Sequence, residues 1–312
     1  MHYDVSDRIE PERRAAIERL LAEVGLAEHR QALSDHLMID FRDGGDGFLS
    51  VTAAPEPERA PIAYAQASRA NETFAVEMAI APAERSELDS LVAGLIDHLT
   101  AAIGESGGGA VNWWIHGDAP LSDLAERIGF VENRRLLQMR MPLPSERTAD
   151  VATRAFVVGQ DEEEWVGVNN RAFAGHGEQG GWTTDALRQR ESESWFDPQG
   201  FRMHERDDRL AAFCWTKVHV ATEYEPESIG EIYVIAVDPD FHGLGLGSQL
   251  TLAGLDHLSS LGTTTGMLYV DAANTTAVTM YERLGYRTHT TSTAHHLVIP
   301  FRSETGRSET GR

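Results

Sequence analysis

The sequence contains one cysteine and no long apolar run, and each absence excludes a class of protein. Cys214 cannot form a disulfide within the chain, and its place in the apolar run 211–215 predicts a buried structural thiol rather than a nucleophile. No apolar segment approaches the roughly 20 residues that span a bilayer, and the start, Met1 to Asp4, is acidic and unlike a signal peptide. We therefore expect a cytoplasmic protein.

Basic residues are also scarce, with 27 Lys and Arg against 49 Asp and Glu and a formal net charge of −22. Binding nucleic acid requires clusters of Lys and Arg, so we expect no nucleic-acid partner. An acidic surface suits a cationic small molecule, and it is equally a common route to solubility. The 312 residues, 41% of them hydrophobic, predict two soluble domains of about 150 residues each.

The two halves of the chain share a repeated pattern. Residues 76–99 and 232–258 each read as a strand, a proline turn and an amphipathic segment that ends in Asp-His-Leu, and 125–130 resembles 281–286. The separation is 157 residues at Pro82 and Pro239 and 156 residues at Gly129 and Gly285. This nearly constant offset indicates a duplicated domain.

The seam between the copies is expected at Pro142 to Arg147, where prolines and polar residues interrupt the apolar pattern. Domains of 1–143 and 144–302 follow, and the polar tail 303–312 is expected to be disordered. Helices are predicted over 13–21 and 121–128, and strands over 74–80 and 232–237. The fold class is therefore α/β, with two tandem domains that each contain a mixed central sheet flanked by helices.

The segment 237–250 places glycines at positions 243, 245 and 247, after a strand and at the start of a helix. Such glycines let backbone N–H groups converge on a phosphate, and the helix dipole adds to the attraction. A tight turn without a ligand is the alternative. The spacing matches neither a Walker loop nor the Rossmann fingerprint.

Two motifs in the right order resemble the GCN5-related N-acetyltransferase superfamily. The pyrophosphate loop of that family, Gln/Arg-x-x-Gly-x-Gly/Ala, falls on His242, Gly245 and Gly247, with His242 in place of Gln or Arg. Its second pattern, Asn-x-x-Ala-x-x-x-Tyr-x-x-x-Gly-Phe/Tyr, is matched throughout residues 274–286. This resemblance implies tandem acyltransferase-type domains and acetyl-CoA as the co-substrate.

Residues 169–183, 195–198, 215–219 and 230–234 resemble the mycothiol synthase family more closely. That family acetylates the cysteinyl amine of cysteinyl-glucosaminyl-inositol, so the resemblance implies this small-molecule acceptor. It implies substrate contacts at Asp35, where the family usually has Glu, and at Glu178, Lys217, Glu231 and Tyr269. The cofactor-binding residues that it implies are Ile235, Ala236, Val237, His242, Gly243, Leu244, Gly245, Leu246, Gly247, Ser248, Asn274, Thr275, Thr276, Ala277, Val278 and Thr279.

Acetyl transfer to an amine needs a base, an acid and a polarised thioester carbonyl. Glu231 is the candidate general base, directly or through one water, and a structural ion pair is its alternative role. Tyr281 is the candidate acid toward the coenzyme A sulfur, and a core tyrosine is the alternative. Backbone N–H groups near 235–237 would polarise the carbonyl. No metal is implied, because His219, His295 and His296 lack the spacing of a zinc site.

The first copy has lost this equipment. At the same offsets Arg85, Leu88 and Ser90 replace His242, Gly245 and Gly247, and Ala125 replaces Tyr281. Carboxylates at Glu87 and Asp89 would disfavour a pyrophosphate. We predict that this domain supports the second and helps to form the acceptor site without catalysing. The rival interpretation is that Arg85 and a shifted backbone still hold the cofactor.

Two alternative functions remain at this stage. One is an acetyltransferase for another small amine, such as an aminoglycoside or a polyamine. The other is a non-catalytic acyl-CoA sensor, against which the presence of both Glu231 and Tyr281 argues. The tandem layout suggests a monomer.

Overall fold

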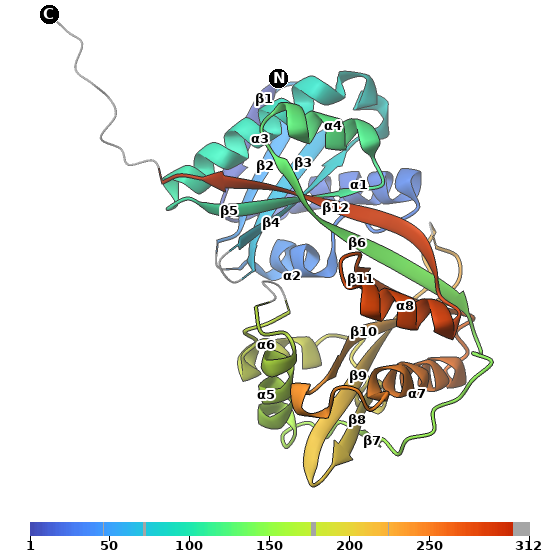
Figure 1. Ribbon diagram of the computed structural model, residues 1–312. Coiled ribbons are helices and arrows are strands. Elements are labelled where there is room, and N and C mark those ends of the chain that lie inside the picture. The colour runs from blue at the N-terminus through green and yellow to red at the C-terminus, as the bar shows by residue number, and fades with distance from the viewer. Residues whose placement is uncertain (46, 71–72, 176–178, 224, 302–312) are drawn as a thin grey trace, which may run out of the picture. The chain divides into compact units, whose positions relative to one another are not determined.

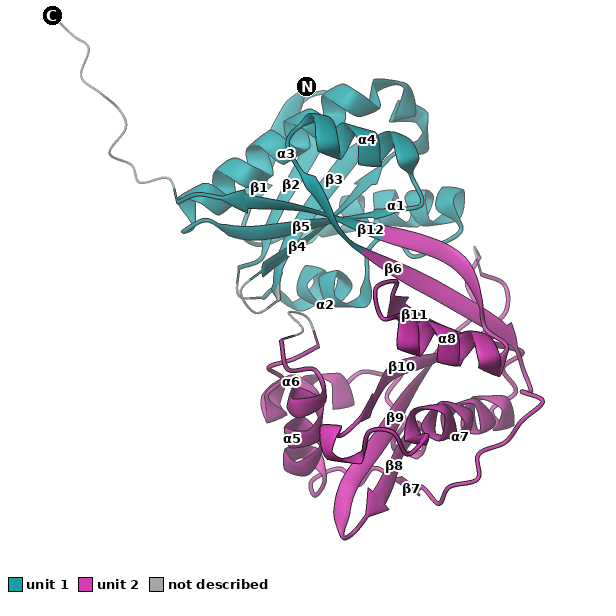
Figure 2. Ribbon diagram, in the orientation of Figure 1, with its two compact units in different colours: residues 1–134, 293–312 teal, residues 135–292 magenta. Residues whose placement is uncertain are grey.

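The computed structural model describes residues 1–45, 47–70, 73–175, 179–223 and 225–301. The chain divides into two compact units, coloured in Figure 2. Unit 1 contains residues 1–134 together with the segment that begins at Thr293, and unit 2 contains residues 135–292. The expected tail 303–312 lies outside the described residues. No helix among the described residues is long and apolar enough to cross a membrane.

Unit 1 contains a sheet with strand order β1-β2-β3-β4-β5, and the end of β12 follows β5 (Figure 1). β4 and β5 are parallel, and the other pairs from β1 to β4 are antiparallel. The bounds of its elements are β1 His2–Ser6, α1 Pro11–Glu28, α2 Asp35–Asp43, β2 Leu49–Ala54, β3 Ala63–Ala70, β4 Thr73–Ile80, η1 Pro82–Glu87, α3 Leu88–Glu105, β5 Gly109–His116, α4 Ala119–Arg127 and the start of β6 Val131–Pro142.

Alternate residues of these strands face different helices. Ala63, Ala65 and Ala67 belong to the apolar core that α3 completes with Leu91, Leu95 and Leu99. Gln66, on the opposite face of β3, donates to the backbone oxygen of Leu37 in α2, and Arg13 of α1 donates to Thr52. Because successive strand residues point to opposite faces, α3 covers one face of the sheet and α1 and α2 the other.

Unit 2 has the strand order β6-β11-β10-β9-β8-β7. β10 and β11 are parallel, and the other pairs are antiparallel. The bounds are β7 Arg154–Ala155, α5 Glu162–Ala172, α6 Thr184–Glu191, η2 Pro198–Gly200, β8 Phe201–Arg206, β9 Arg209–His219, β10 Ile229–Val237, η3 Pro239–Phe241, α7 Leu246–Ser260, β11 Thr265–Asp271, α8 Thr275–Leu284 and the start of β12 Arg287–Ile299.

Two separate cores cover the faces of this sheet. One packs Cys214 and Ile232 against leucines of α7 and against Tyr281 of α8. The other packs Phe213 and Trp215 against Trp165 of α5 and Leu187 of α6. Cys214 is fully buried and free, as predicted for a structural thiol, and burial raises its pKa.

The duplication predicted from the sequence is confirmed by the order of the elements. Unit 1 runs β4-η1-α3-β5-α4-β6 and unit 2 runs β10-η3-α7-β11-α8-β12. The units do not follow the expected boundary at residue 143, since one division falls within β6 and the other within β12. The last part of β12 thus belongs to unit 1, where Ile299 joins the core and the ring of His296 lies 3.0 Å from the Asn112 side chain.

Candidate active site

The pairing of β10 with β11 ends before either strand does. Register partners run from Ile229 with Thr265 to Ile232 with Leu268, although β10 continues to Val237. At the same point β10 has a bulge against β9, since Ile232 pairs with Thr216 and Val234 with Trp215, and Tyr233 lies between them. The bulge shifts the alternation, because Ile232 packs in the α7 core while Tyr233 and Val234 pack in the aromatic core. Beyond Ile232 the register of β10 with β11 does not continue.

The glycine loop follows directly. Gly243 and Gly245 have φ of +81° and +74°, a left-handed conformation that L side chains rarely adopt. Gly245 is the N-cap of α7, and no side chain caps the first turn of this helix. A Cβ on Gly247 would lie 3.3 Å from the Met280 sulfur. The first-turn N–H groups therefore remain available to a phosphate, so the loop fits the pyrophosphate of coenzyme A.

His242, which stands in the family position for Gln or Arg, is exposed, and its Nε2 lies 3.1 Å from the backbone oxygen of Val237. Leu244 is half exposed, and Leu246 is buried in the α7 core. Ser248 donates to the backbone oxygen of Gly245. These side chains shape the loop, while its backbone offers the donors.

α8 contributes the second motif. The Asn274 side chain accepts a hydrogen bond from the backbone N–H of Ala277 and so caps the helix. Residues Thr275, Thr276 and Thr279 are exposed, and Ala277 and Val278 are half buried. The predicted contact of Asn274 with the cofactor thus coincides with a structural role for its side chain.

Tyr281 is buried, and its ring packs edge to face on Tyr286 with centroids 5.8 Å apart. Burial raises the pKa of Tyr281, which keeps the hydroxyl protonated near neutral pH. No described residue forms a hydrogen bond with this hydroxyl. It is therefore a neutral donor whose proton is not committed to the protein.

Glu231 lies on β10, two residues before the bulge, with its side chain 7% exposed. Its Oε2 lies 2.6 Å from Nε2 of His219, the last residue of β9. No other described residue forms a hydrogen bond with this carboxylate. A buried carboxylate on a strand that leads to a phosphate loop can act as a general base.

Lys217 is the cross-strand partner of Glu231 and is also buried. Its Nζ lies 4.6 Å from the ring centroid of Trp195 and 5.6 Å from that of Tyr233. These cation–π contacts hold the ammonium at a fixed place on the sheet. A positive group beside Glu231 suits a polar acceptor rich in hydroxyl groups.

Two asparagines of α5 hold the segment that precedes α6. The Asn170 amide exchanges hydrogen bonds with both backbone groups of Trp182, and Asn169 donates to the backbone oxygen of Gln179. This network explains structurally why the stretch 169–183 carries paired asparagines. The predicted substrate residue Glu178 lies outside the described residues.

Tyr269, on β11, accepts a hydrogen bond of 2.7 Å from Gln138 of β6. It is 45% exposed, unusual for a strand tyrosine, so its ring can meet a ligand. Asp35, by contrast, belongs to unit 1, where it is the first residue of α2.

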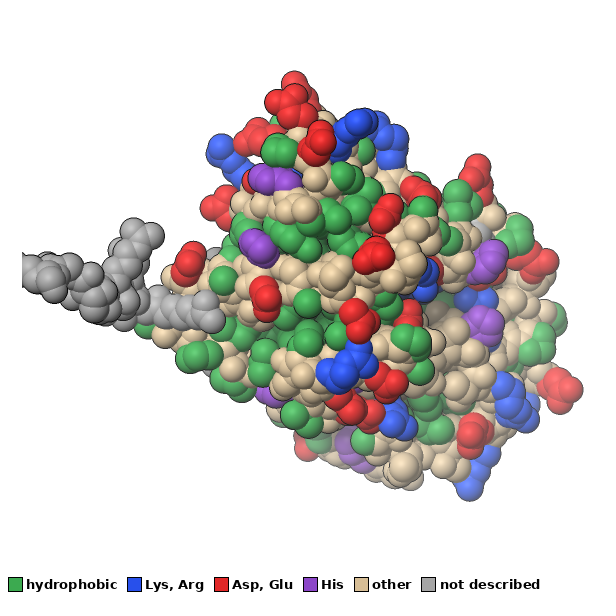
Figure 3. Space-filling model, turned by 90° about the horizontal axis from the view of Figure 1, so that it is seen from above, with side chains coloured by type: hydrophobic (Ala, Val, Ile, Leu, Met, Phe, Trp, Pro, Cys, Tyr) green, Lys and Arg blue, Asp and Glu red, His purple; other side chains and the backbone are tan. Residues whose placement is uncertain are grey.

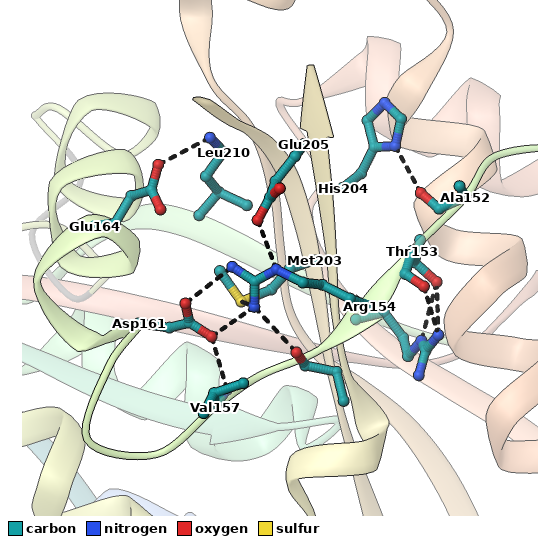
Figure 4. Close-up of polar contacts among 12 residues, drawn as sticks. Ala152, Thr153, Arg154, Val157, Asp161, Glu164, Met203, His204, Glu205 and Leu210 are labelled. Atoms are coloured by element: carbon teal, nitrogen blue, oxygen red, sulfur yellow. Dashed lines mark hydrogen bonds and ion pairs between the residues drawn. The ribbon is translucent and has the colours of Figure 1, made fainter. Parts of the chain in front are cut away.

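Polar contacts at the edge of unit 2 fasten the start of α5, which carries the asparagines (Figure 4). Both terminal nitrogens of Arg154 bind the Asp161 carboxylate, at 2.6 and 2.9 Å, and its Nε binds Glu205 of β8. Asp161 also accepts the backbone N–H of Val157. Burial alone would raise the pKa of Asp161, but these donors and the Arg154 charge lower it.

The corresponding region of unit 1 has a different chemistry. Arg85 forms ion pairs with Glu28 and Asp118, and α3 begins directly after η1 without a left-handed glycine. Ala125, at the place of Tyr281, is fully buried. The cavity beside Trp114 and His116 measures about 40 Å³, room for a few water molecules.

Comparison with known proteins agrees with this geometry. Residues 147–286 match the family model described as the Acetyltransferase (GNAT) family. A mycothiol acetyltransferase of Acidothermus cellulolyticus is 40% identical over 307 residues, covering 90% of this chain and 92% of that protein. The chain belongs to the mycothiol acetyltransferase family. The relative from Thermobispora bispora, with the same name, is 42% identical over 83% of this chain and 88% of its own length.

A solved structure supports the tandem fold of this mycothiol acetyltransferase family member. The tandem GNAT protein from the clavulanic acid biosynthesis pathway has a TM-score of 0.69 at 12% identity and covers 97% of this chain and 99% of its own. The fold class and the assignment as an acyltransferase are thereby confirmed. As a GNAT acyltransferase, the protein uses an acyl-CoA.

Two further observations concern metal ions and the charge on the surface. Within the described part of the chain, no three His, Cys, Asp or Glu side chains gather as metal ligands. On the face shown in Figure 3, acidic side chains are scattered, and the basic side chains drawn there form no continuous patch.

Sequence reasoning missed several residues that build the site. The contacts of His219 with Glu231 and of Trp195 with Lys217 were not predicted, nor was the bulge at Tyr233. One signal was present, because Lys217 and His219 are two residues apart on a strand and so share a face. The register of β9 with β10, which places Lys217 opposite Glu231, depends on where the connecting segment 220–228 ends the two strands and could not be read from the sequence.

Proposed function

We propose that this chain transfers the acetyl group of acetyl-CoA to the primary amine of cysteinyl-glucosaminyl-inositol and so forms mycothiol. The observation that carries the proposal is the buried Glu231 carboxylate beside Lys217, on the strand that leads into the glycine loop. The names and identities of the relatives support the acceptor. The glycine loop supports coenzyme A as the acyl carrier.

Glu231 would take a proton from the acceptor ammonium, directly or through one water, and the neutral nitrogen would then attack the thioester carbon. A backbone N–H in the part of β10 beyond its register with β11, near residues 235–237, would polarise the carbonyl oxygen. Tyr281 would donate its proton to the departing thiolate. Its burial in the same apolar core as Ile232 of β10 supports this role.

The other proposed contacts divide into those with the cofactor and those with the acceptor. The cofactor would lie against Ile235 to Val237, the loop from His242 to Ser248, and the start of α8. Lys217 and Tyr269 would contact the acceptor, with Asp35 and Glu178 as further contacts. Unit 1 would not catalyse, because a buried alanine occupies the place of the acid and its Arg85 is engaged by two carboxylates.

The test is release of free thiol from acetyl-CoA by wild type and by Glu231→Gln. Cysteinyl-glucosaminyl-inositol is compared with a panel that includes an aminoglycoside and a polyamine. Turnover restricted to the first acceptor, and reduced at least a hundredfold in the variant, is expected. Equal or faster turnover of another amine would overturn the acceptor assignment, and an unaffected variant would overturn the role of Glu231.

A further inference from the structure

We propose that His219 is a positioning residue for acyl transfer, which anchors one oxygen of Glu231 so that the other faces the acceptor amine. The inference rests on the proposed role of Glu231 as the base. It adds a residue that is absent from the set of contacts implied by the sequence. Its chemistry is that of a base held by an orienting partner.

The geometry defines which atom carries the shared hydrogen. His219 Nε2 and Glu231 Oε2 are 2.6 Å apart. An ionised carboxylate can only accept hydrogen bonds, so the hydrogen belongs to Nε2. The imidazole is thereby assigned the Nε2–H tautomer when neutral, with the Nδ1 lone pair away from Glu231.

Glu231 needs such an anchor because Lys217, its register partner on β9, does not donate a hydrogen bond to the carboxylate. The side chain of Lys217 lies opposite in the register, yet its Nζ is held over the rings of Trp195 and Tyr233. In the described part of the chain, His219 alone donates to the carboxylate. Without it, a buried and flexible Glu would lose both its partner and its fixed direction.

The burial of the Glu231 and His219 side chains also supports a positioning role for His219. The Glu231 side chain is 7% exposed and that of His219 is 30% exposed. One carboxylate oxygen is occupied by His219, and Oε1 has no hydrogen bond to any described residue. A base requires such an oxygen within about 3 Å of the proton that it removes.

The experiment compares His219→Gln, His219→Asn and His219→Leu in the thiol-release assay. Gln carries an N–H donor at nearly the reach of Nε2, Asn carries the same donor on a shorter side chain, and Leu carries none. We expect kcat to fall about tenfold to a hundredfold for Asn and Leu and to stay within about fivefold of wild type for Gln, while KM for acetyl-CoA stays within about twofold. His204→Leu is the matched control, since that histidine bonds only a backbone oxygen, of Ala152, at the edge of unit 2.

A double-mutant cycle separates positioning from a structural role. If His219 acts through Glu231, His219→Leu in a Glu231→Gln background lowers kcat by less than about twofold. An equal loss in both backgrounds, or equal rates for Gln and Asn variants, would overturn the inference. If His219→Leu does not fold, the comparison of Gln with Asn decides alone.

Failure of the proposed function gives a different result. Wild type would then show no turnover of cysteinyl-glucosaminyl-inositol, and the same variants would be compared on whichever amine is acetylated. An active wild type with an indifferent His219→Asn variant would overturn only the role of His219.

Discussion

Arg171, near the end of α5, binds the buried carboxylate of Asp238, the residue that follows β10 and caps η3 just before the glycine loop. Its Nε lies 3.1 Å from Oδ2, and the Asp238 side chain is 1% exposed. The other oxygen, Oδ1, accepts the backbone N–H of Asp240. The start of the cofactor loop is therefore anchored to the helix whose asparagines hold the segment before α6.

Replacing Arg171 by alanine should loosen this anchor. The Asp238 carboxylate would stay buried without its cation, which costs about 1 to 2 kcal/mol once the half-exposed position of Arg171 is taken into account. We expect denaturant unfolding to report this loss and KM for acetyl-CoA to rise. Arg209→Ala is the control, because its ion pair with Asp240 is exposed on both sides and should contribute less to stability than the Arg171 pair. Equal losses for the two variants would refute the anchor.

Stability should fall as acid is added. Donors and positive charge lower the pKa of Asp161 and Asp238 despite their burial. The unfolded carboxyls, with a pKa of about 3.9, bind protons before the folded ones do, so this stabilisation is complete above that value and disappears as pH falls through the folded pKa.

Urea unfolding between pH 6 and pH 3 measures this dependence. Asp161→Asn should flatten the slope below about pH 4, since the variant lacks one of the titrating groups. Asp185→Asn should leave the slope unchanged, because Asp185 is 91% exposed in its pair with Arg188. If Asp161→Asn and Asp185→Asn changed the pH dependence of the unfolding free energy in the same way, the assignment of acid sensitivity to Asp161 would be wrong.

Gly245→Ala tests the phosphate loop. An L residue at its φ of +74° costs about 1 to 2 kcal/mol, as does Gly262→Ala at a φ of +85° after the end of α7. Both variants should therefore lose similar stability in thermal unfolding. Only Gly245→Ala should raise KM for acetyl-CoA, by about tenfold, or 1.4 kcal/mol of binding free energy. If Gly245→Ala and Gly262→Ala had the same KM for acetyl-CoA, the glycine loop would not be part of the cofactor site.

Tyr281→Phe tests the acid. The hydroxyl binds no described residue, so the fold should persist while kcat falls by about a hundredfold. Tyr286→Phe is the matched control: its hydroxyl is fully buried with no hydrogen-bond partner among the described residues, and removing it should leave kcat unchanged and stability equal or higher. Steady-state kinetics on both purified variants measures these effects. Loss of activity in Tyr286→Phe alone would contradict the role of Tyr281 and assign the acid to Tyr286.

The repeat, the strand-turn-helix pattern and the buried Cys214 could be predicted because each depends on local sequence. The glycine loop was equally visible, since glycine has few other reasons to alternate before a helix. The partners of Glu231 and Lys217 could not be predicted, because the register between β9 and β10 sets which side chains lie opposite one another. Nor could the place where β12 passes from one unit to the other, since the residues up to that place, 287–293, are all polar and show no apolar alternation.

That passage of β12 affects the order in which the protein can be built. A ribosome releases residues 1–134 first, yet the strand that follows β5 in their sheet is made from residues after Thr293. Until those residues have been made, β5 presents an unpaired edge, a surface that invites pairing with other chains. Unit 1, whose synthesis begins first, is thus completed only after unit 2 has been made, whereas unit 2 is encoded by one uninterrupted stretch, residues 135–292.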